Sequence, residues 1–350
     1  MTFPFNLYLC AFLAALGTSA LSFPFWRWWC LRTGHVDDPG HRKIHSSAMP
    51  LAGGLTVMTG FFLPIFIGAA ALHLSGSLID ANQRELIEYG LLRRRGELAA
   101  ILFGALGMVA LGWLDDRYEL NPLLKFGGQF VLAFLVARSG IRITVFVPVP
   151  ALNYALTILW ILTLTNALNF LDNMNGLCSG LGVIAAWACA WCAAIQGQYL
   201  VALIAFLICG GLLGFLPFNF PNAKAFLGDA GSHLVGFLIA ILAVLPNFYS
   251  REAPHPLAVL VPLIIVAVPL FDLVSVVIIR WRSGKPFWIG DTNHISHRLV
   301  RKGYSRSHAV LLILLLHALT AFVAVQLLSR GLRSPQPPSQ PETAYAVVKP

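Results

Sequence analysis

The sequence predicts an all-α membrane protein with about ten transmembrane helices and a polar site at one membrane face. Two observations carry this prediction: the composition of the chain and the uneven placement of its acidic residues. Of the 350 residues, 57% are hydrophobic and only 11% are charged, whereas a soluble domain carries roughly 25% charged residues. Most of the chain is therefore expected to lie in lipid.

Apolar segments of membrane-spanning length recur along the whole chain. A helix needs about 20 apolar residues to cross the hydrocarbon core of a bilayer. The first such segment lacks the basic residues that precede a signal-peptide core, so we expect it to be a transmembrane helix. The expected spans lie near residues 5–26, 53–74, 97–114, 122–138, 151–169, 177–195, 198–217, 231–247, 256–280 and 307–329.

The remaining segments and the net charge indicate the domain organisation and the expected partners. Residues 1–330 are expected to form one membrane-embedded domain, with a short surface helix in the polar insertion 75–96. The Pro- and Ser-rich residues 331–350 are expected to be a disordered tail. The net charge is +9, but the basic residues lie in short loops between apolar segments. Anionic lipid head groups are therefore the expected partner, and nucleic acid is not.

Aspartate and glutamate residues are distributed unequally between the two sides of the membrane. Ten spans place residues 27–52, 115–121, 170–176, 218–230 and 281–306 on one side of the membrane, here named side A. Counted with Lys125 and Arg280 in the adjoining spans, side A holds 14 of the 24 Lys and Arg residues, which favours it as the cytoplasmic side by the positive-inside rule. Counted with Asp272 of the ninth span, it also holds eight of the nine aspartates, while five of the six glutamates lie opposite. A metal and phosphate site built from short carboxylates would sort the acids in this way.

Two side A loops carry aspartate and asparagine clusters. The loop GWLDDRYELNPLLK places Asp115 and Asp116 side by side, with Lys125 nine residues later. Neighbouring carboxylates repel unless a cation or a proton lies between them, although a solvated helix end is the alternative. The loop TNALNFLDNMNGLCSG places Asn169 and Asp172 three residues apart, on one face of a helical turn. It holds more amides than the capping of one helix needs.

A third loop, FNFPNAKAFLGDAGSHLVG, opens a helix with small residues. Gly228, Asp229, Gly231 and Ser232 form this opening. A helix N-terminus of this kind can approach a phosphate closely, and Asp229 beside the anion would require a cation. The alternative is that Asp229 only caps the helix. Lys224, shortly before, adds a second expected phosphate contact.

The first and last side A loops are basic. The last one, GKPFWIGDTNHISHRLVRKGYSRSH, holds His294, His297 and Arg298, and the first one holds Lys43. Two histidines without a third ligand make a poor zinc site, so a cationic cradle for a diphosphate is the preferred interpretation. An ordinary basic surface loop is the alternative for each loop alone. Five such loops on one side favour a shared site.

In this order, the motifs resemble those of a known enzyme family. The segments DDPGHRKIH, GWLDD, NALNFLDNMNG, FLGDAGS and DTNHISHRL lie between Asp37 and Tyr304. They are similar to the motifs of the polyprenyl-phosphate N-acetylhexosamine-1-phosphate transferases, the WecA/MraY-type superfamily or glycosyltransferase family 4. Five motifs in matching order are a specific signal.

The resemblance implies a fold, a reaction and a location. The fold would have ten or eleven helices and a cytoplasmic cleft in the inner, or plasma, membrane. The reaction would transfer N-acetylhexosamine-1-phosphate, with GlcNAc-1-phosphate preferred, from a UDP-sugar to undecaprenyl or another polyprenyl phosphate. UMP would be released, and a cell-envelope glycan would be initiated. The resemblance also implies Mg²⁺, with Mn²⁺ as the alternative, and suggests a homodimer.

The resemblance also implies roles for individual residues. Asp229 would bind Mg²⁺, with Asn169 as the second metal ligand, and Asp115, Asp116 and Asp172 would be catalytic. One of the two adjacent aspartates would deprotonate or hold the lipid phosphate. The residues expected to bind the substrates are Asn169, Asn175, Lys43, Lys125, Lys224, His294, His297 and Arg298.

Departures from the family pattern bear on the choice of substrate. Asn173 and Asn175 stand where the family usually has glycine and aspartate, and Ser296 replaces the middle histidine of the last motif. The His-Arg-Leu ending favours the GlcNAc-type branch, with the phospho-MurNAc-pentapeptide transferases, which make lipid I, as the alternative.

A membrane transporter is the alternative of another class. Only Asp272 lies well inside an expected span, whereas a transport path would place polar groups near the midplane of the membrane. The same ninth span contains Pro262 and Pro269 and is expected to bend. We expect this bend to help form a lateral groove for the isoprenoid tail.

Overall fold

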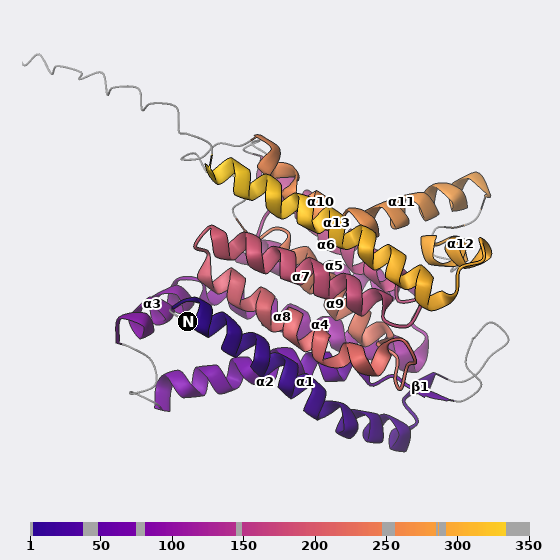
Figure 1. Ribbon diagram of the computed structural model, residues 1–350, viewed down its shortest axis with the longest axis horizontal. Coiled ribbons are helices and arrows are strands. Elements are labelled where there is room, and N and C mark those ends of the chain that lie inside the picture. The colour runs from indigo at the N-terminus through magenta and orange to yellow at the C-terminus, as the bar shows by residue number, and fades with distance from the viewer. Residues whose placement is uncertain are drawn as a thin grey trace, which may run out of the picture.

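The computed structural model of the chain is a bundle in which most of the long helices run roughly along one common axis (Figure 1). The structure describes residues 3–37, 48–74, 81–144, 149–246, 256–284, 286 and 292–333. Two short strands, β1 (Val36–Asp37) and β2 (Met49–Pro50), pair antiparallel with Val36 opposite Pro50. All other regular elements in this part of the chain are helical, as the composition predicts.

The helices follow the expected spans closely. They are α1 (Phe5–Thr33), α2 (Gly53–Leu74), α3 (Ala81–Arg93), α4 (Arg95–Tyr118), α5 (Pro122–Ser139), α6 (Pro150–Phe170), α7 (Leu177–Ile195), α8 (Tyr199–Asn219), α9 (Gly228–Leu242), η1 (Pro256–Leu260), α10 (Val261–Ile265), α11 (Ala267–Arg282), α12 (Ile295–Arg301) and α13 (Arg306–Arg333). Each of the ten expected spans contains a helix, and α3 is the helix expected in the polar insertion.

Seven of the described helices are long and apolar enough to cross a membrane, namely α1, α2, α4, α6, α7, α8 and α13. An eighth crossing results if the bent pair of α10 and α11 counts as one span. The chain is therefore a multi-pass membrane protein. The helix α5 has 18 residues and α9 has 15, and these two occupy further expected spans.

The expected bend in the ninth span is present. The axes of residues 258–265 and 267–282 differ by 67°. Pro269 has no amide hydrogen for a bond to the Ile265 carbonyl, and its ring clashes with that carbonyl in a straight helix. The sequence-based prediction of a bend is thus confirmed, whereas the lipid groove stays a prediction.

The helix α9 is the centre of the bundle. Every residue of α9 except Asp229 is buried, and α9 packs against α4 and α6 on two sides. A helix that is apolar all round must be surrounded by other helices. The outer helices α1 and α13 instead expose leucine and phenylalanine side chains, as lipid contact requires.

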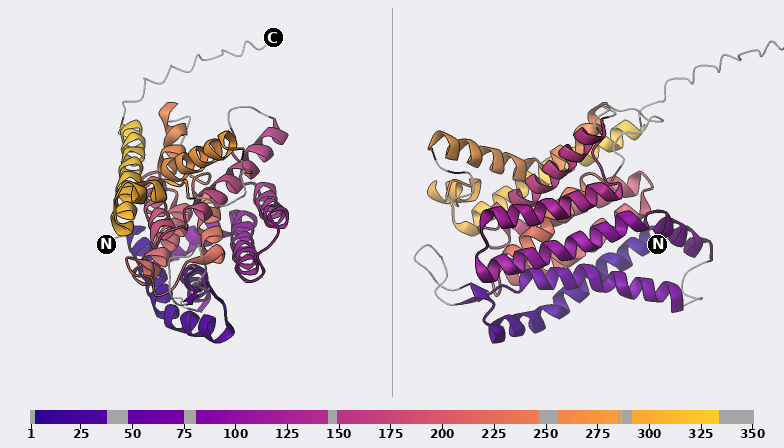
Figure 2. Two further views of the ribbon diagram at one scale, coloured as in Figure 1. Left: turned by 90° about the vertical axis from the view of Figure 1, so that its right-hand side faces the viewer. Right: turned by 180° about the vertical axis from the view of Figure 1, so that it is seen from behind.

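The loops of side A meet at one end of the bundle. Figure 1 shows β1 and α12 at this end, whereas α3 lies at the opposite end. The start of α1 and the end of α13 also lie at the opposite end, and the view from behind agrees (Figure 2). Both termini of the described bundle therefore lie on one side, as the sequence predicts.

Two glycines bring neighbouring backbones close to the start of α9. A Cβ atom on Gly112 of α4 would stand 2.3 Å from the carbonyl oxygen of Asp229. A Cβ atom on Gly54 of α2 would stand 2.5 Å from the amide nitrogen of Gly231. Glycine at both positions therefore places the N-terminus of α9 directly between α2 and α4.

Candidate active site

A lysine ammonium lies at the centre of the carboxylate cluster. Lys125 Nζ on α5 is 2.6 Å from Asp115 Oδ2 on α4 and 2.7 Å from Asp229 Oδ2 on α9. It is also 3.5 Å from the Asn169 side-chain oxygen on α6. Asn169 donates from Nδ2 to Asp229 Oδ1 at 2.8 Å and to Ser232 Oγ at 2.9 Å. Four helices thus bring one cation and several oxygen atoms together.

The adjacent aspartates of α4 point to different partners. Asp115 pairs with Lys125 and also accepts from the backbone amide of Leu120 at 2.9 Å. Asp116 instead accepts from the backbone amides of Asp229 and Ala230, at 2.9 and 3.1 Å. These amides belong to the first turn of α9 and have no acceptor within their own helix. Asp116 therefore caps α9 across the interface between the two helices.

Asp172 lies in the turn after α6, close to the same group of charges. Burial raises the pKa of the Asp172 carboxyl well above its ordinary range, and the negative charges of Asp229 and Asp116 raise it further. A backbone hydrogen bond from Gly228 opposes this shift. Burial and the neighbouring carboxylates therefore both favour the protonated form of Asp172.

The last basic motif is anchored by an aspartate inside the bent span. His294 Nδ1 is 2.7 Å from Asp272 Oδ2, and the amide of Ile295 donates to Asp272 Oδ1 at 2.7 Å. Asp272 and His294 are both buried. This pair fixes the start of α12 against α11 and accounts for the one aspartate that the sequence places inside a span.

A hydrogen bond joins α12 to the loop that carries Asp172. Ser296 Oγ donates to Asn173 Oδ1 at 2.7 Å, and Ser296 is fully buried. His297 lies one residue further along α12. Burial lowers the pKa of His297, and the positive charges of His294, Arg301 and Arg306 lower it further. This lowering favours the neutral form of His297 at neutral pH.

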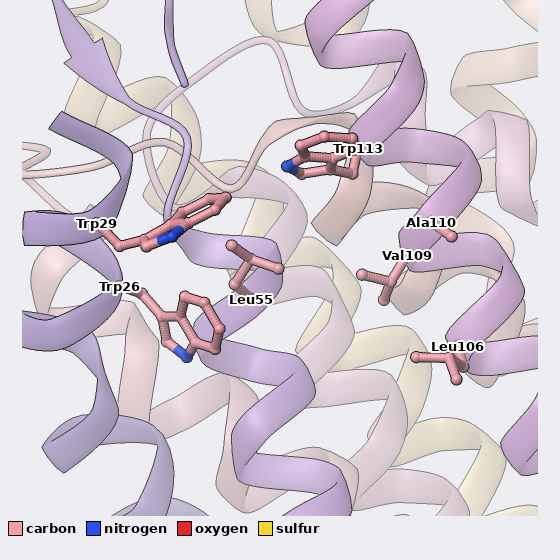
Figure 3. A pocket seen from close by; sticks show the side chains of 7 residues that line it. All are labelled: Trp26, Trp29, Leu55, Leu106, Val109, Ala110 and Trp113. Carbon is pink, nitrogen blue, oxygen red and sulfur yellow. The ribbon is translucent and has the colours of Figure 1, made fainter. Parts of the chain in front are cut away.

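A separate cavity lies between α1, α2 and α4. Its volume is about 340 Å³ (Figure 3). It is lined by Trp26, Trp29, Leu55, Leu106, Val109, Ala110 and Trp113. Residues two apart on a helix point to nearly opposite sides, so Trp113 faces away from Asp115. The lining has no charged group for a phosphate, which separates this cavity from the carboxylate cluster.

Comparison with known proteins places the chain in a family. A sequence model of glycosyl transferase family 4 matches residues 98–247. The probable undecaprenyl-phosphate N-acetylglucosaminyl 1-phosphate transferase of Bacillus subtilis is 33% identical over 91% of this chain and 84% of the relative. The chain belongs to glycosyl transferase family 4. Family members of this kind are glycosyl-1-phosphate transferases, so the chain is an enzyme.

Two further relatives carry related names. The decaprenyl-phosphate N-acetylglucosaminephosphotransferase of Mycobacterium tuberculosis is 32% identical over 84% of this chain and 76% of the relative. The undecaprenyl-phosphate alpha-N-acetylglucosaminyl 1-phosphate transferase of Escherichia coli is 27% identical over 84% of this chain and 77% of the relative. The resemblance seen in the motifs to the GlcNAc-1-phosphate branch is thereby confirmed.

The cluster of this family 4 enzyme contains the kinds of donor atom that Mg²⁺ prefers. Its donors are carboxylate and amide oxygens, which Mg²⁺ prefers. Within the described residues, no group of three or more acidic, histidine or cysteine side chains forms a ready metal centre. The Lys125 ammonium instead stands between Asp115 and Asp229. The donor types suit a divalent cation, and the Lys125 ammonium balances part of their charge. Metal binding stays a prediction.

The structure brings half of the residues expected in the site together. The contacts above connect Asp115, Asp116, Lys125, Asn169 and Asp229 in one group, and Asp172 interacts electrostatically with it. The alternative that Asp229 only caps α9 finds no support, because Asp116 supplies that cap. Catalysis and metal binding by these residues stay predictions.

Other expected site residues make different contacts. Asn175 donates to the Pro221 carbonyl at 3.2 Å, which ties two side A loops together. Lys224 places its ammonium 6.0 Å from the ring centre of Phe218. Arg298 lies in the last turn of α12, beside His297. Lys43 lies outside the described residues.

Sequence reasoning missed two buried polar residues beneath the cluster. Gln129 on α5 and His233 on α9 are fully buried, and Gln129 Nε2 is 3.3 Å from His233 Nε2. Each lies four residues after a member of the cluster, Lys125 or Asp229. A polar residue one helical turn below a charged one, in an otherwise apolar helix, was the available signal.

Proposed function

We propose that this enzyme transfers GlcNAc-1-phosphate from UDP-GlcNAc to a polyprenyl phosphate and releases UMP. The observation that supports this best is the Lys125 ammonium held between Asp115 and Asp229. Such a site suits anionic phosphates and a divalent cation better than a neutral substrate. The names of the relatives describe the same sugar phosphate and the same class of lipid.

The proposed reaction is a direct phosphoryl transfer. An oxygen of the lipid phosphate attacks the β-phosphorus of UDP-GlcNAc and forms a new P–O bond. The bond from the β-phosphorus to the oxygen bridging the two phosphates breaks, and UMP leaves with that oxygen. Bound Mg²⁺, held by Asp229 and Asn169, would neutralise charge on the diphosphate.

The side chains of the cluster have different proposed roles in this transfer. Lys125 is placed to attract the incoming phosphates and to balance charge as the P–O bond breaks. Asp115, which shares Lys125, is the better candidate to hold or deprotonate the lipid phosphate, because both oxygens of Asp116 already bind α9. We assign Asp172 the role of a carboxyl whose charge state depends on the bound cation.

The basic residues of α12 complete the proposed site. His297 and Arg298 lie on a helix that Ser296 joins to Asn173. We propose that they contact the diphosphate of the sugar donor. Lys224 and Asn175 border the same end of the bundle, and we retain them as donor contacts together with Lys43.

We further propose ten membrane crossings, with the site on the cytoplasmic face of the plasma membrane. Counting α5, α9 and the α10–α11 pair with the seven long helices gives ten. An even number agrees with the two ends of the bundle lying on one side (Figure 1). Residues 1–330 then form one domain. A homodimer, as the resemblance suggests, stays a prediction.

The product would initiate a cell-envelope glycan. The alternative product, lipid I, is disfavoured because Ser296 is buried and bound to Asn173, where the lipid I branch has histidine. A transporter is disfavoured because Asp272, the aspartate inside the bent span, is bound to His294 and Ile295. Its carboxylate has a structural partner and does not require a transported ion.

The bend between α10 and α11 is our proposed groove for the isoprenoid tail. The tryptophan-lined cavity of Figure 3 is the rival apolar site. Replacing Pro262 and Pro269 by alanine should change the apparent KM for long lipids more than for truncated ones. If Ala110→Trp, which fills the cavity, has that effect instead, the tail lies between α1, α2 and α4.

The decisive experiment is UMP release by the purified full chain in detergent. The assay contains undecaprenyl phosphate, Mg²⁺ and one member of a panel of UDP-sugars, and Asp229→Asn is the inactive control. We expect release with UDP-GlcNAc that needs both lipid and metal. EDTA should abolish it, and added Mg²⁺ or Mn²⁺ should restore it.

Three outcomes would contradict parts of the proposal. Release without lipid would indicate hydrolysis of the donor. Preference for the UDP-MurNAc-pentapeptide donor would establish the lipid I alternative. Labelled sugar phosphate bound covalently to the protein in the absence of lipid would replace direct transfer by a phospho-enzyme route.

A further inference from the structure

A second polar layer lies one helical turn below the carboxylate cluster. The upper layer consists of Lys125 on α5, Asn169 on α6 and Asp229 on α9. The lower layer consists of Gln129, Asn166 and His233 on the same three helices. The spacings are four, three and four residues, and each corresponds to about one turn of helix. Every member of the upper layer therefore has a polar counterpart directly beneath it.

The lower layer is a continuous chain of hydrogen bonds. Asn166 Nδ2 donates to Gln129 Oε1 at 2.7 Å and to the Leu162 carbonyl at 2.8 Å. Gln129 Nε2 lies 3.3 Å from His233 Nε2. Because Gln129 uses its oxygen for Asn166, its nitrogen is the donor to His233. The Nε2 atom of His233 must then be an acceptor, and the imidazole is neutral with its proton on Nδ1.

The hydrogen bond between Gln129 and His233 joins α5 to α9, two helices that face each other across the gap between α4 and α6. Both α5 and α9 pack against α4 and against α6. Two side-chain contacts join α5 directly to α9: Lys125 with Asp229, and Gln129 with His233. One contact is exposed to incoming substrates, whereas the other is fully buried and cannot be reached by them.

The buried polar side chains of the lower layer are not what stability alone would favour at these positions. His233 Nδ1 is buried without a hydrogen-bond partner among the described residues. An unsatisfied buried donor destabilises the folded state, and apolar side chains of similar size often replace buried polar groups without loss of stability. Hydrogen bonds are directional, unlike apolar contacts, so they fix the axial position of one helix relative to the next.

We infer that Asn166, Gln129 and His233 form a positioning layer that sets the register at which Lys125, Asn169 and Asp229 meet. The inference rests on the proposed function for its activity readout. All three are buried beneath the cluster, so the role inferred for them is that of positioning residues. Outer partners of this kind typically change activity or metal affinity by about 10- to 100-fold when they are removed.

The test compares substitutions that break or keep the chain of hydrogen bonds. His233→Met and Gln129→Met should each lower kcat by about 10- to 100-fold and leave the unfolding temperature unchanged or higher. The double variant should cost no more than either single one, because each already breaks the layer. His233→Gln, whose side-chain oxygen can accept from Gln129, should restore most of the activity.

A matched control is present in α13. His317 is fully buried and bonds to the Leu181 carbonyl at 3.2 Å, and its Nδ1 has no hydrogen-bond partner within the part of the chain that the structure describes. It therefore shares the environment of His233 but lies away from the cluster. His317→Met should keep UMP release within about twofold, since its single bond joins no member of the site.

A second readout separates this inference from the proposed function. Binding of Mn²⁺ to the full chain, followed by electron paramagnetic resonance, needs no turnover. We expect His233→Met to weaken Mn²⁺ binding and His233→Gln to retain it, even if the wild type releases no UMP. Additive losses in the double variant, no rescue by His233→Gln, an equal loss in His317→Met or no Mn²⁺ binding by the wild type would overturn the positioning layer.

Discussion

The carboxylate of Asp116 accepts the backbone amide of Asp229 at 2.9 Å, so one acidic residue of the site holds another through its main chain. The two residues are separated by 113 positions in the sequence. Their contact fixes the start of α9 against the end of α4. It also distinguishes Asp116, which supports the fold, from Asp115, which shares the lysine of the site.

Asp116→Ala should destabilise the protein by about 1–3 kcal/mol, because it leaves two amides at the start of α9 unpaired. Asp116→Asn keeps one side-chain oxygen and should cost less. The measurement is thermal unfolding in detergent. Glu85→Ala, at an exposed position on α3, is the control and should change stability by less than about 0.5 kcal/mol. Equal stability of Asp116→Ala and the wild type would remove the capping role.

Lys125→Met should lower UMP release by about 100-fold or more, because the site loses the cation that faces the phosphates. Binding of Mn²⁺ should not weaken, since the substitution removes a positive charge that bonds to Asp229. Initial rates and resonance titrations measure the two effects. Arg95→Met, at the opposite end of α4, is the control. Parallel losses of activity and metal binding would mean that Lys125 only maintains the structure of the site.

Asp172→Asn should stabilise the metal-free protein, and the gain should grow as the pH rises. The pKa of Asp172 is raised in the folded state, so below the ordinary aspartate pKa the carboxyl is protonated whether the chain is folded or not, and the substitution has no effect. Between the ordinary pKa and the raised folded-state pKa, Asp172 is ionised in the unfolded chain but protonated in the folded one. The free energy of unfolding of the wild type therefore falls as the pH rises through this range. Unfolding temperatures from pH 4 to pH 8 test this. A difference that is constant with pH would contradict it.

Ser296→Ala should raise the apparent KM for UDP-GlcNAc by about 2- to 10-fold, with kcat within about twofold. The substitution removes the bond to Asn173 that docks α12, and such a bond contributes about 0.5–1.5 kcal/mol. Steady-state kinetics measures both constants. Ser305→Ala, whose hydroxyl bonds to His308 at an exposed position, is the control and should match the wild type. A fall in kcat at unchanged KM would show that α12 acts on the chemical step and not on donor binding.

Much of the fold follows from the sequence because the bilayer restricts the choices. An apolar segment of about 20 residues must become a helix in lipid, and α2 and α7 begin and end where the sequence predicts. The bend at Pro269 also follows from local chemistry. The membership of the site follows from the alternation of sides, which collects Asp115, Asn169 and Asp229 at one end of the bundle.

Only the tertiary structure decided which of these residues meet and how. No spacing along the chain shows that Lys125 stands between Asp115 and Asp229, that Asp116 caps α9, or that Asp272 holds His294. The spacing of Gln129 and His233 was an available signal, but their contact with each other was decided by the tertiary structure. Hydropathy determines that a segment becomes a helix and which end faces the loops. The rotation and height of one helix against another depend on side-chain packing between segments distant in sequence, and this packing sets the contacts in the site.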